Sequence, residues 1–168
     1  MPRVGIALGS NLGDRLANLR AARDLLVSLG RPGTGHLQAP IYQTTPVNCP
    51  PESPEFYNTV VEIDFEGTPV ALLAQTQRIE TQLGRTVAGE RNAPRVIDVD
   101  LLYFGEEILD SGALVLPHPR LTRRRFVLQP LADIRPELKL PGNDTAIAEH
   151  LRRLDSNEPA IHLVAAEW

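Results

Sequence analysis

The sequence contains a single cysteine, Cys49. One cysteine cannot form an intramolecular disulfide or a cysteine-based metal site, which fits a protein of the reducing cytosol. The N-terminus runs from Met1 into a short apolar stretch that is too brief for a signal peptide or a membrane span. We therefore predict a cytoplasmic protein with no membrane partner.

The chain also lacks a net positive charge, and it has few lysines and aromatic residues. The formal net charge is −4, Lys139 is the only lysine, and aromatic residues make up 5% of the chain. Sheets that bind RNA present a basic face with interleaved aromatic side chains, and the predicted strands lack this pattern. The composition therefore argues against nucleic acid as a partner and against a non-catalytic RNA- or protein-binding module. The Gly-x-x-x-x-Gly-Lys-Ser/Thr and Gly-x-Gly-x-x-Gly motifs of nucleotide-binding loops are absent too, so the glycine-containing turn at residues 9–13 is interpreted as structural.

The 168 residues suffice for one domain, residues 1–168, with a substantial core. Apolar alternation predicts strands, helical apolar spacing predicts helices, and glycine or proline marks their ends. The main elements expected are a strand at 3–10, a helix from a cap at Asp14 to Gly30, strands at 36–45 and 56–65, a helix at 69–83 and a strand at 96–104. Short segments are expected at 108–109 and 113–116, a short helix at 146–154 and a strand at 161–164. This order predicts an α+β fold with a ferredoxin-like β-α-β-β-α-β core, an antiparallel sheet with helices packed on one or both faces.

The stretch at residues 46–54 contains four prolines and has no periodicity. Prolines at this density are incompatible with a regular strand, so a loop is expected. Long loops inside compact domains often bind ligands or close over them, although a passive connector is the alternative.

The most informative stretch is residues 91–104, which reads Arg-Asn-Ala-Pro-Arg-Val-Ile-Asp-Val-Asp-Leu-Leu-Tyr-Phe. Side chains alternate between the faces of a strand, so Asp98 and Asp100 share one face and Val99 lies on the other. Two neighbouring carboxylates on an otherwise apolar strand repel each other unless a cation lies between them.

Two kinds of cation could fill this role. Arg91 and Arg95 lie just upstream and could pair with the carboxylates directly. Alternatively, the carboxylates could bind Mg²⁺, which is commonly held by one or two carboxylates together with substrate phosphates. The arginines would then bind the remaining phosphate oxygens, a combination typical of phosphoryl transfer.

The string Arg-x-Ala-Pro-Arg-x-x-Asp-x-Asp-Leu-Leu resembles the signature of the 6-hydroxymethyl-7,8-dihydropterin pyrophosphokinase family. Further matches are Ala7-Leu8-Gly9-Ser10-Asn11, Tyr42-Gln43-Thr44, Phe56-Tyr57-Asn58, Gln77-Arg78-Ile79-Glu80 and Pro117-His118-Pro119. The resemblance implies a ferredoxin-like fold and an enzyme of folate biosynthesis that transfers pyrophosphate from ATP to a pterin alcohol. The implied partners are these two small molecules, and a monomer is expected.

The resemblance also implies roles for individual residues. Asp98 and Asp100 would bind two Mg²⁺ ions, and Arg85 and Arg95 would be catalytic together with these aspartates. The implied ATP-binding residues are Gln77, Glu80, Arg95, Leu101, His118 and Arg124. The implied pterin-binding residues are Thr44, Thr45, Val47, Phe56, Asn58, Asp98 and Phe126. Without the resemblance, Phe56 and Phe126 would be interpreted as core residues, and Gln77 and Glu80 as solvent-facing residues on one side of their helix.

The sequence departs from the family pattern at two positions. Asn92 stands where many relatives carry tryptophan, and Pro119 stands where some carry an aromatic residue. Both differences concern how the substrates are enclosed and leave the aspartate pair intact. The aspartates and arginines alone are also compatible with a Mg²⁺-dependent nucleotidyl- or monophosphoryl-transferase. Phe56, Asn58 and Phe126 are the residues that favour a pterin.

Overall fold

The structure is a computed structural model that describes residues 2–45, 54–84, 96–155 and 157–168. Its elements in chain order are β1 (Arg3–Ser10), α1 (Arg15–Leu29), β2 (Leu37–Gln38), β3 (Ile41–Thr44), β4 (Phe56–Asp64), α2 (Pro69–Gln82), β5 (Asp98–Phe104), β6 (Leu109–Asp110), β7 (Val115–Leu116), a 3-10 turn (Leu121–Arg123), α3 (Arg125–Ile134), α4 (Ile147–Arg152) and β8 (Ile161–Ala165). None of the helices in these described ranges combines the length and apolarity that crossing a membrane would require.

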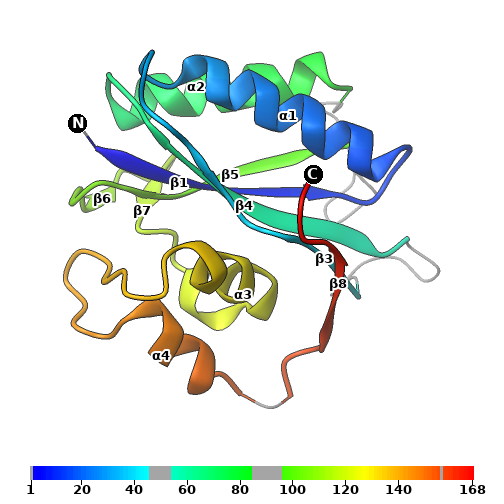
Figure 1. The fold of residues 1–168 in the computed structure, drawn as a ribbon. Coiled ribbons are helices and arrows are strands. Elements are labelled where there is room, and N and C mark those ends of the chain that lie inside the picture. Colours follow the sequence, from blue (N-terminus) through cyan, green and yellow to red (C-terminus); the bar gives the residue numbers. More distant parts are fainter. Residues whose placement is uncertain (1, 46–53, 85–95, 156) are drawn as a thin grey trace.

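The strands form one main antiparallel sheet in the order β5-β1-β4-β3-β8, and β2 also pairs with β4 (Figure 1). The first four strands of this order, joined through α1 and α2, have the ferredoxin-like arrangement, which confirms the predicted fold class. The C-terminal β8 extends this sheet beyond β3. A separate two-stranded sheet joins β6 to β7.

The strand predicted at residues 36–45 is two shorter strands, β2 and β3. Both pair with β4, and between them the Ala39 N–H still donates to the Val60 carbonyl at 2.9 Å. Pro40 follows and has no N–H to donate, so the regular ladder is interrupted at this point.

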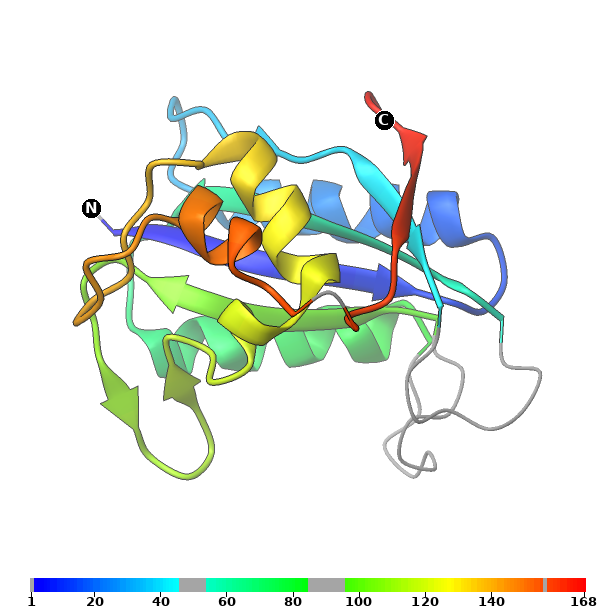
Figure 2. The same cartoon turned by 90° about the horizontal axis from the view of Figure 1, so that it is seen from below.

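Helices cover both faces of the sheet, α1 and α2 on one face and α3 and α4 on the other (Figures 1 and 2). Alternate residues of the strands therefore enter two different cores. Val4, Ile6 and Leu8 pack under α1 and α2, whereas Val60 and Leu102 pack under α3 and α4. The central strands β1 and β4 are buried along most of their length, whereas β8 is largely exposed, and the transfer of apolar surface from water stabilises the layered arrangement.

The helix starts follow the sequence signals. The Asp14 carboxylate accepts a hydrogen bond from the Ala17 N–H at 3.0 Å, and the Thr68 hydroxyl oxygen caps α2 by accepting one from the Ala71 N–H at 3.1 Å. Both bonds satisfy amide groups that have no partner inside the helix.

Helix α3 was not predicted from the sequence. Pro130 lies inside it, and the consecutive arginines that precede Phe126 gave no helix-start signal. The helix nevertheless forms because Val127, Leu128 and Leu131 make a continuous apolar face that is buried on the sheet.

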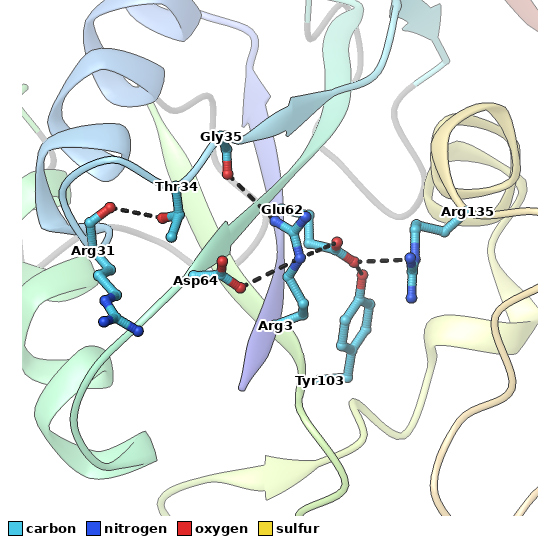
Figure 3. A network of polar contacts seen from close by, with 8 residues as sticks. All are labelled: Arg3, Arg31, Thr34, Gly35, Glu62, Asp64, Tyr103 and Arg135. Atoms are coloured by element: carbon cyan, nitrogen blue, oxygen red, sulfur yellow. Dashed lines mark hydrogen bonds and ion pairs between the residues drawn. The ribbon is translucent and has the colours of Figure 1, made fainter. Parts of the chain in front are cut away.

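A buried ionic network around Glu62 lies on the face of the sheet that α3 covers, next to the end of that helix (Figure 3). Glu62 on β4 is 0% exposed, and its carboxylate accepts a short hydrogen bond from the Tyr103 hydroxyl. The Nε atoms of Arg3 and Arg135 lie 3.5 Å from its two oxygens. Burial, with the Glu62 charge beside it, raises the pKa of Tyr103 well above its ordinary value of 10.0. Tyr103 therefore stays a neutral donor, and the network ties the end of α3 to β1, β4 and β5.

Candidate active site

Some of the predicted site residues lie close together at the end of the sheet where β1 finishes. In the strand register, Asp98 on β5 lies opposite Gly9 on β1, and Gly9 lies opposite Asn58 on β4. Paired residues of antiparallel strands share a face, so Asp98 and Asn58 both point to the α3 side of the sheet.

The aspartate pair has the alternation that the sequence predicts. Asp98 is partly exposed and Asp100 is exposed, while Val99 and Leu101 are buried in the core under α1 and α2. Asp100 lies opposite Ala7, two positions along β1 from the partner of Asp98. The two carboxylates are therefore neighbours on one face, at the edge strand of the sheet.

Gly9 makes room for the Asn58 side chain. A Cβ atom at position 9 would lie 2.8 Å from Asn58 Oδ1 and 3.6 Å from Phe56 Cδ1. Asn58 is 8% exposed, and its amide donates to Thr44 Oγ1 at 2.7 Å. Because Gly9 has no side chain, the Asn58 amide oxygen can lie over β1. It is thus close to the cross-strand pair of Gly9 and Asp98. Gly9 belongs to the strand itself, and the turn begins after it, with Gly13 at φ +75°.

Helix α3 brings a cation and a ring to the same face. Phe126 in its first turn is partly buried, and the Arg124 guanidinium carbon lies 5.4 Å from the centre of the Phe126 ring. Burial and the nearby Arg120 lower the pKa of Arg124, and the negative charges of Asp100 and Glu158 oppose this effect. Arg124 remains charged, since guanidinium groups do not deprotonate in proteins. The phenylalanines at positions 56 and 126 are both partly exposed, and Phe126 also packs against the core under α3 and α4.

His118 is held beside β5 by its backbone. Its N–H donates to the Leu102 carbonyl at 2.7 Å, and its ring Nδ1 accepts a hydrogen bond from the Arg120 N–H at 3.1 Å. Burial, followed by the charges of Arg124 and Arg120, lowers the pKa of His118 from 6.5. The ring is therefore neutral near pH 7, and because Nδ1 accepts, its proton is on Nε2, which can donate to a ligand.

Glu80 and Gln77 differ in solvent exposure, which the sequence pattern did not indicate. Gln77 is exposed, but Glu80 is only 8% exposed, and its carboxylate accepts a hydrogen bond from the Val99 N–H at 3.2 Å. The expectation of a solvent-facing Glu80 was wrong, because β5 is an edge strand whose outward amide needs an acceptor. Glu80 thus fixes the backbone between Asp98 and Asp100.

A shallow hollow of about 500 Å³ runs along α2 and is lined by Ala74, Gln77, Arg78, Thr81 and Gln82. Gln77 is the one predicted site residue in this lining. The chemistry of the aspartate pair is therefore located by the strand register and not by this hollow.

The remaining predicted site residues are either away from the aspartate face or outside the described residues. Thr45 is exposed at the end of β3. The Leu101 side chain is 4% exposed in the core, so a contact with nucleotide would go through its backbone. Val47, Arg85 and Arg95 lie outside the described residues, as do Arg91 and Asn92. Their roles stay predictions.

Two residues for which the sequence predicts no role hold the chain that enters β4. Asn11 donates to the Pro54 carbonyl at 3.1 Å, and Arg15 donates to the Glu55 carbonyl at 2.8 Å. The Arg15 guanidinium also lies 3.9 Å from the centre of the Tyr57 ring. These contacts fix the backbone next to Phe56. Asn11 belonged to a quoted motif, but Arg15 had no signal beyond its charge.

Comparison with known proteins gives one consistent result. Residues 5–136 match the family described as 7,8-dihydro-6-hydroxymethylpterin-pyrophosphokinase (HPPK). The 2-amino-4-hydroxy-6-hydroxymethyldihydropteridine pyrophosphokinase of Pseudomonas aeruginosa is 41% identical over 140 residues, which cover 83% of this chain and 84% of that protein. The protein of the same name from Bacillus subtilis is 43% identical over 129 residues, covering 77% and 75%.

Longer proteins contain a similar region. The mitochondrial folate synthesis bifunctional protein of Pisum sativum is 43% identical over 131 residues, and this chain spans only 25% of its length. A solved structure of Plasmodium falciparum HPPK-DHPS superposes with a TM-score of 0.69 at 15% identity, covering 90% of this chain and 44% of that one. This likeness shows the fold.

Proposed function

Since the chain belongs to the 7,8-dihydro-6-hydroxymethylpterin-pyrophosphokinase family, we propose that Asp98 and Asp100 bind Mg²⁺ together with the phosphates of ATP. The protein transfers pyrophosphate to hydroxymethyldihydropterin in folate synthesis, with ATP as the donor. The observation that carries the proposal is the placement of both carboxylates on one face, two positions apart on an edge strand.

The donor set at this edge fits Mg²⁺. The ion prefers oxygen ligands and is commonly held by one or two carboxylates plus substrate phosphates and water. Within the described ranges, no group of three or more His, Cys, Asp or Glu side chains could hold a metal by itself, so Asp98 and Asp100 would share the ion with the nucleotide. When bound, two such ions would neutralise phosphate charge and polarise the attacking and leaving oxygens. We propose two ions per site.

The groups around the aspartates suit a polyphosphate. Arg124 supplies a fixed positive charge on the same face, and a desolvated guanidinium binds phosphate oxygens strongly. His118 offers an Nε2–H donor without adding charge. Gln77 is exposed on α2, where it could reach the nucleotide. Glu80 acts on the nucleotide site through the β5 backbone that it holds.

The neighbouring groups suit a flat heterocycle. Phe56 and Phe126 are partly exposed on the face that carries Asn58, and two aromatic rings can enclose a pterin between them. The Asn58 amide, held by Thr44, presents hydrogen-bonding atoms in the plane of such a ring. Thr45, at the end of β3, and Asp98, on β5, would contact the pterin on either side of Asn58. Because Asp98 and Asn58 both lie opposite Gly9 in the strand register, a pterin bound at Asn58 would hold its hydroxymethyl group next to the phosphate-binding groups.

We also propose a monomeric, cytoplasmic enzyme whose partners are these two small molecules. The acidic net charge and the single cysteine support this assignment. Analytical ultracentrifugation at about 5 to 100 μM tests the monomer, and a dimer that forms with a Kd of about 1–10 μM would contradict it.

The metal assignment can be tested without relying on turnover. Asp98→Asn and Asp100→Asn keep the shape of each side chain and remove its charge, so we expect Mn²⁺ binding to the protein with a non-hydrolysable ATP analogue to weaken at least about tenfold. Asp110→Asn, on β6, is the matched control because this exposed aspartate lies in the other sheet. Binding measured by electron paramagnetic resonance that is equal in all four proteins would refute the assignment.

A further inference from the structure

The last part of the chain follows the segment that the family model matches, yet it returns to the site. The family match ends at residue 136, and the following chain forms α4 and β8. Figure 2 shows this segment running from α4 past the start of α3 to β8. β8 then pairs with β3, where Ile161 lies opposite Thr44. Glu158 lies on the stretch between α4 and β8.

Glu158 contacts the first residue of α3. Its carboxylate oxygen Oε1 accepts a hydrogen bond from the Arg125 N–H at 3.3 Å. Arg124, the residue at the cap position, makes no capping hydrogen bond with its own side chain. The first amides of a helix lack partners within the helix and carry partial positive charge, so a carboxylate is stabilising there. Glu158 therefore supplies from the C-terminal segment the cap that α3 does not provide for itself.

A local turn aims Glu158 at the helix. Its own N–H donates to the Asp155 carbonyl at 3.0 Å, and the Asn157 N–H donates to the Asp155 carboxylate at 2.9 Å. Glu158 is partly buried in this position. The contact is thus supported on both sides, by this turn and by the helix.

The capped residue lies between two residues of the proposed site. Arg124 precedes Arg125 and is proposed to bind phosphate, and Phe126 follows it and is proposed to bind the pterin. Arg124 is close to Arg120, which repels it, and the opposing negative charges around it are those of Asp100 and Glu158. A shift of the first turn of α3 would displace the phosphate-binding cation and the pterin-binding ring together.

We propose that Glu158 is a positioning residue, whose hydrogen bond to the Arg125 amide holds Arg124 and Phe126 toward the two substrates. This role rests on the proposed function of that pair. It makes the segment after residue 136 part of the active-site structure, although it belongs to none of the motifs that the family resemblance rests on.

Three variants separate the hydrogen bond from general stability. Glu158→Ala removes the acceptor, Glu158→Gln keeps an acceptor oxygen without the charge, and Glu167→Ala removes an exposed acid from the same C-terminal segment as a control. We expect Glu158→Ala to raise the KM for ATP and for the pterin about fivefold, the size of a lost helix cap, and Glu158→Gln to stay within about twofold of the wild type. Amide hydrogen exchange at Arg125, followed by NMR, should accelerate about fivefold in Glu158→Ala alone.

The outcomes are distinct. An Arg125 exchange rate in Glu158→Ala equal to that of the Glu167→Ala control would overturn the positioning role, as would unchanged KM values in an active enzyme. Glu158→Gln behaving as badly as Glu158→Ala would overturn it as well, because the acceptor would then be irrelevant. A wild-type protein without pterin-dependent activity would contradict the proposed function instead, and the exchange rates would still decide the role of Glu158.

Discussion

Substitution of Gly9 by alanine tests how the pterin-binding amide is placed. The new Cβ atom would lie 2.8 Å from Asn58 Oδ1, closer than two such atoms can approach. The Asn58 side chain cannot simply swing away, since it is 8% exposed and bonded to Thr44 at 2.7 Å. The amide must therefore move, and its hydrogen bond must lengthen or break.

The magnitude follows from two contributions. Inserting a methyl group into a packed site costs about 1–3 kcal/mol, and losing the Thr44 bond contributes about 1 kcal/mol. Together these contributions amount to about 2–4 kcal/mol, which in pterin binding corresponds to roughly a 30- to 900-fold rise in the KM for the pterin. The KM for ATP should change less than about twofold, because the atoms nearest the new Cβ belong to Asn58 and Phe56, which are proposed to bind the pterin.

Steady-state kinetics with each substrate varied in turn provides the assay. Gly35→Ala is the matched control, because a Cβ at position 35 would meet no atom within 4 Å. Thermal unfolding checks that both variants are folded at the assay temperature. An unchanged pterin KM in folded Gly9→Ala, or an equal rise in the KM for ATP, would refute the reasoning.

Three further predictions concern stability. Gly5→Ala would place a Cβ 2.2 Å from Cε1 of the buried Tyr103 ring, so the free energy of unfolding measured by urea denaturation should fall by about 1–3 kcal/mol. A fall of less than about 1 kcal/mol would contradict the packing. Glu80→Ala leaves the Val99 N–H without its acceptor and should lower the free energy of unfolding by about 1–3 kcal/mol, whereas Glu80→Gln should lose clearly less; equal losses would count against the hydrogen bond. Burial and two neighbouring arginines lower the pKa of His118 below 6.5, so its unfolded form binds a proton first as the pH falls. The stability that the neutral ring contributes is complete above pH 6.5 and is lost as the pH falls below that value. The stability difference between wild type and His118→Gln should therefore change as the pH is lowered through 6.5, and a constant difference would refute this.

The sequence predicted the central part of the fold because its signals there are local. Apolar alternation located β1, β4 and β5, and the Asp14 cap and Pro69 located the helix starts. Near the C-terminus, the strand expected at 161–164 is β8 at Ile161–Ala165. Helix α3 escaped prediction because its burial depends on the sheet, while its internal proline argues locally against a helix.

The site was predictable only in part, for a similar reason. The alternation of Asp98 and Asp100 is a property of one strand and was confirmed by the register. The burial of Glu80 and the approach of Glu158 to α3 depend on contacts between segments far apart in the chain, which periodicity cannot report. Gly9 illustrates the limit well, because its role depends on Asn58, which lies 49 positions later in the sequence.

The arrangement of the aspartates is tested most directly by product analysis. Purified protein is incubated with ATP, Mg²⁺ and 6-hydroxymethyl-7,8-dihydropterin, the nucleotides are separated by chromatography, and Asp98→Asn is run beside the wild type and Asp110→Asn. Loss of a group that stabilises several kcal/mol of transition-state charge should slow the reaction at least about a hundredfold. We predict AMP that appears only with pterin and Mg²⁺, is formed normally by Asp110→Asn, and is nearly abolished in Asp98→Asn. AMP formed equally by Asp98→Asn, or ADP as the product of the wild type, would contradict the account.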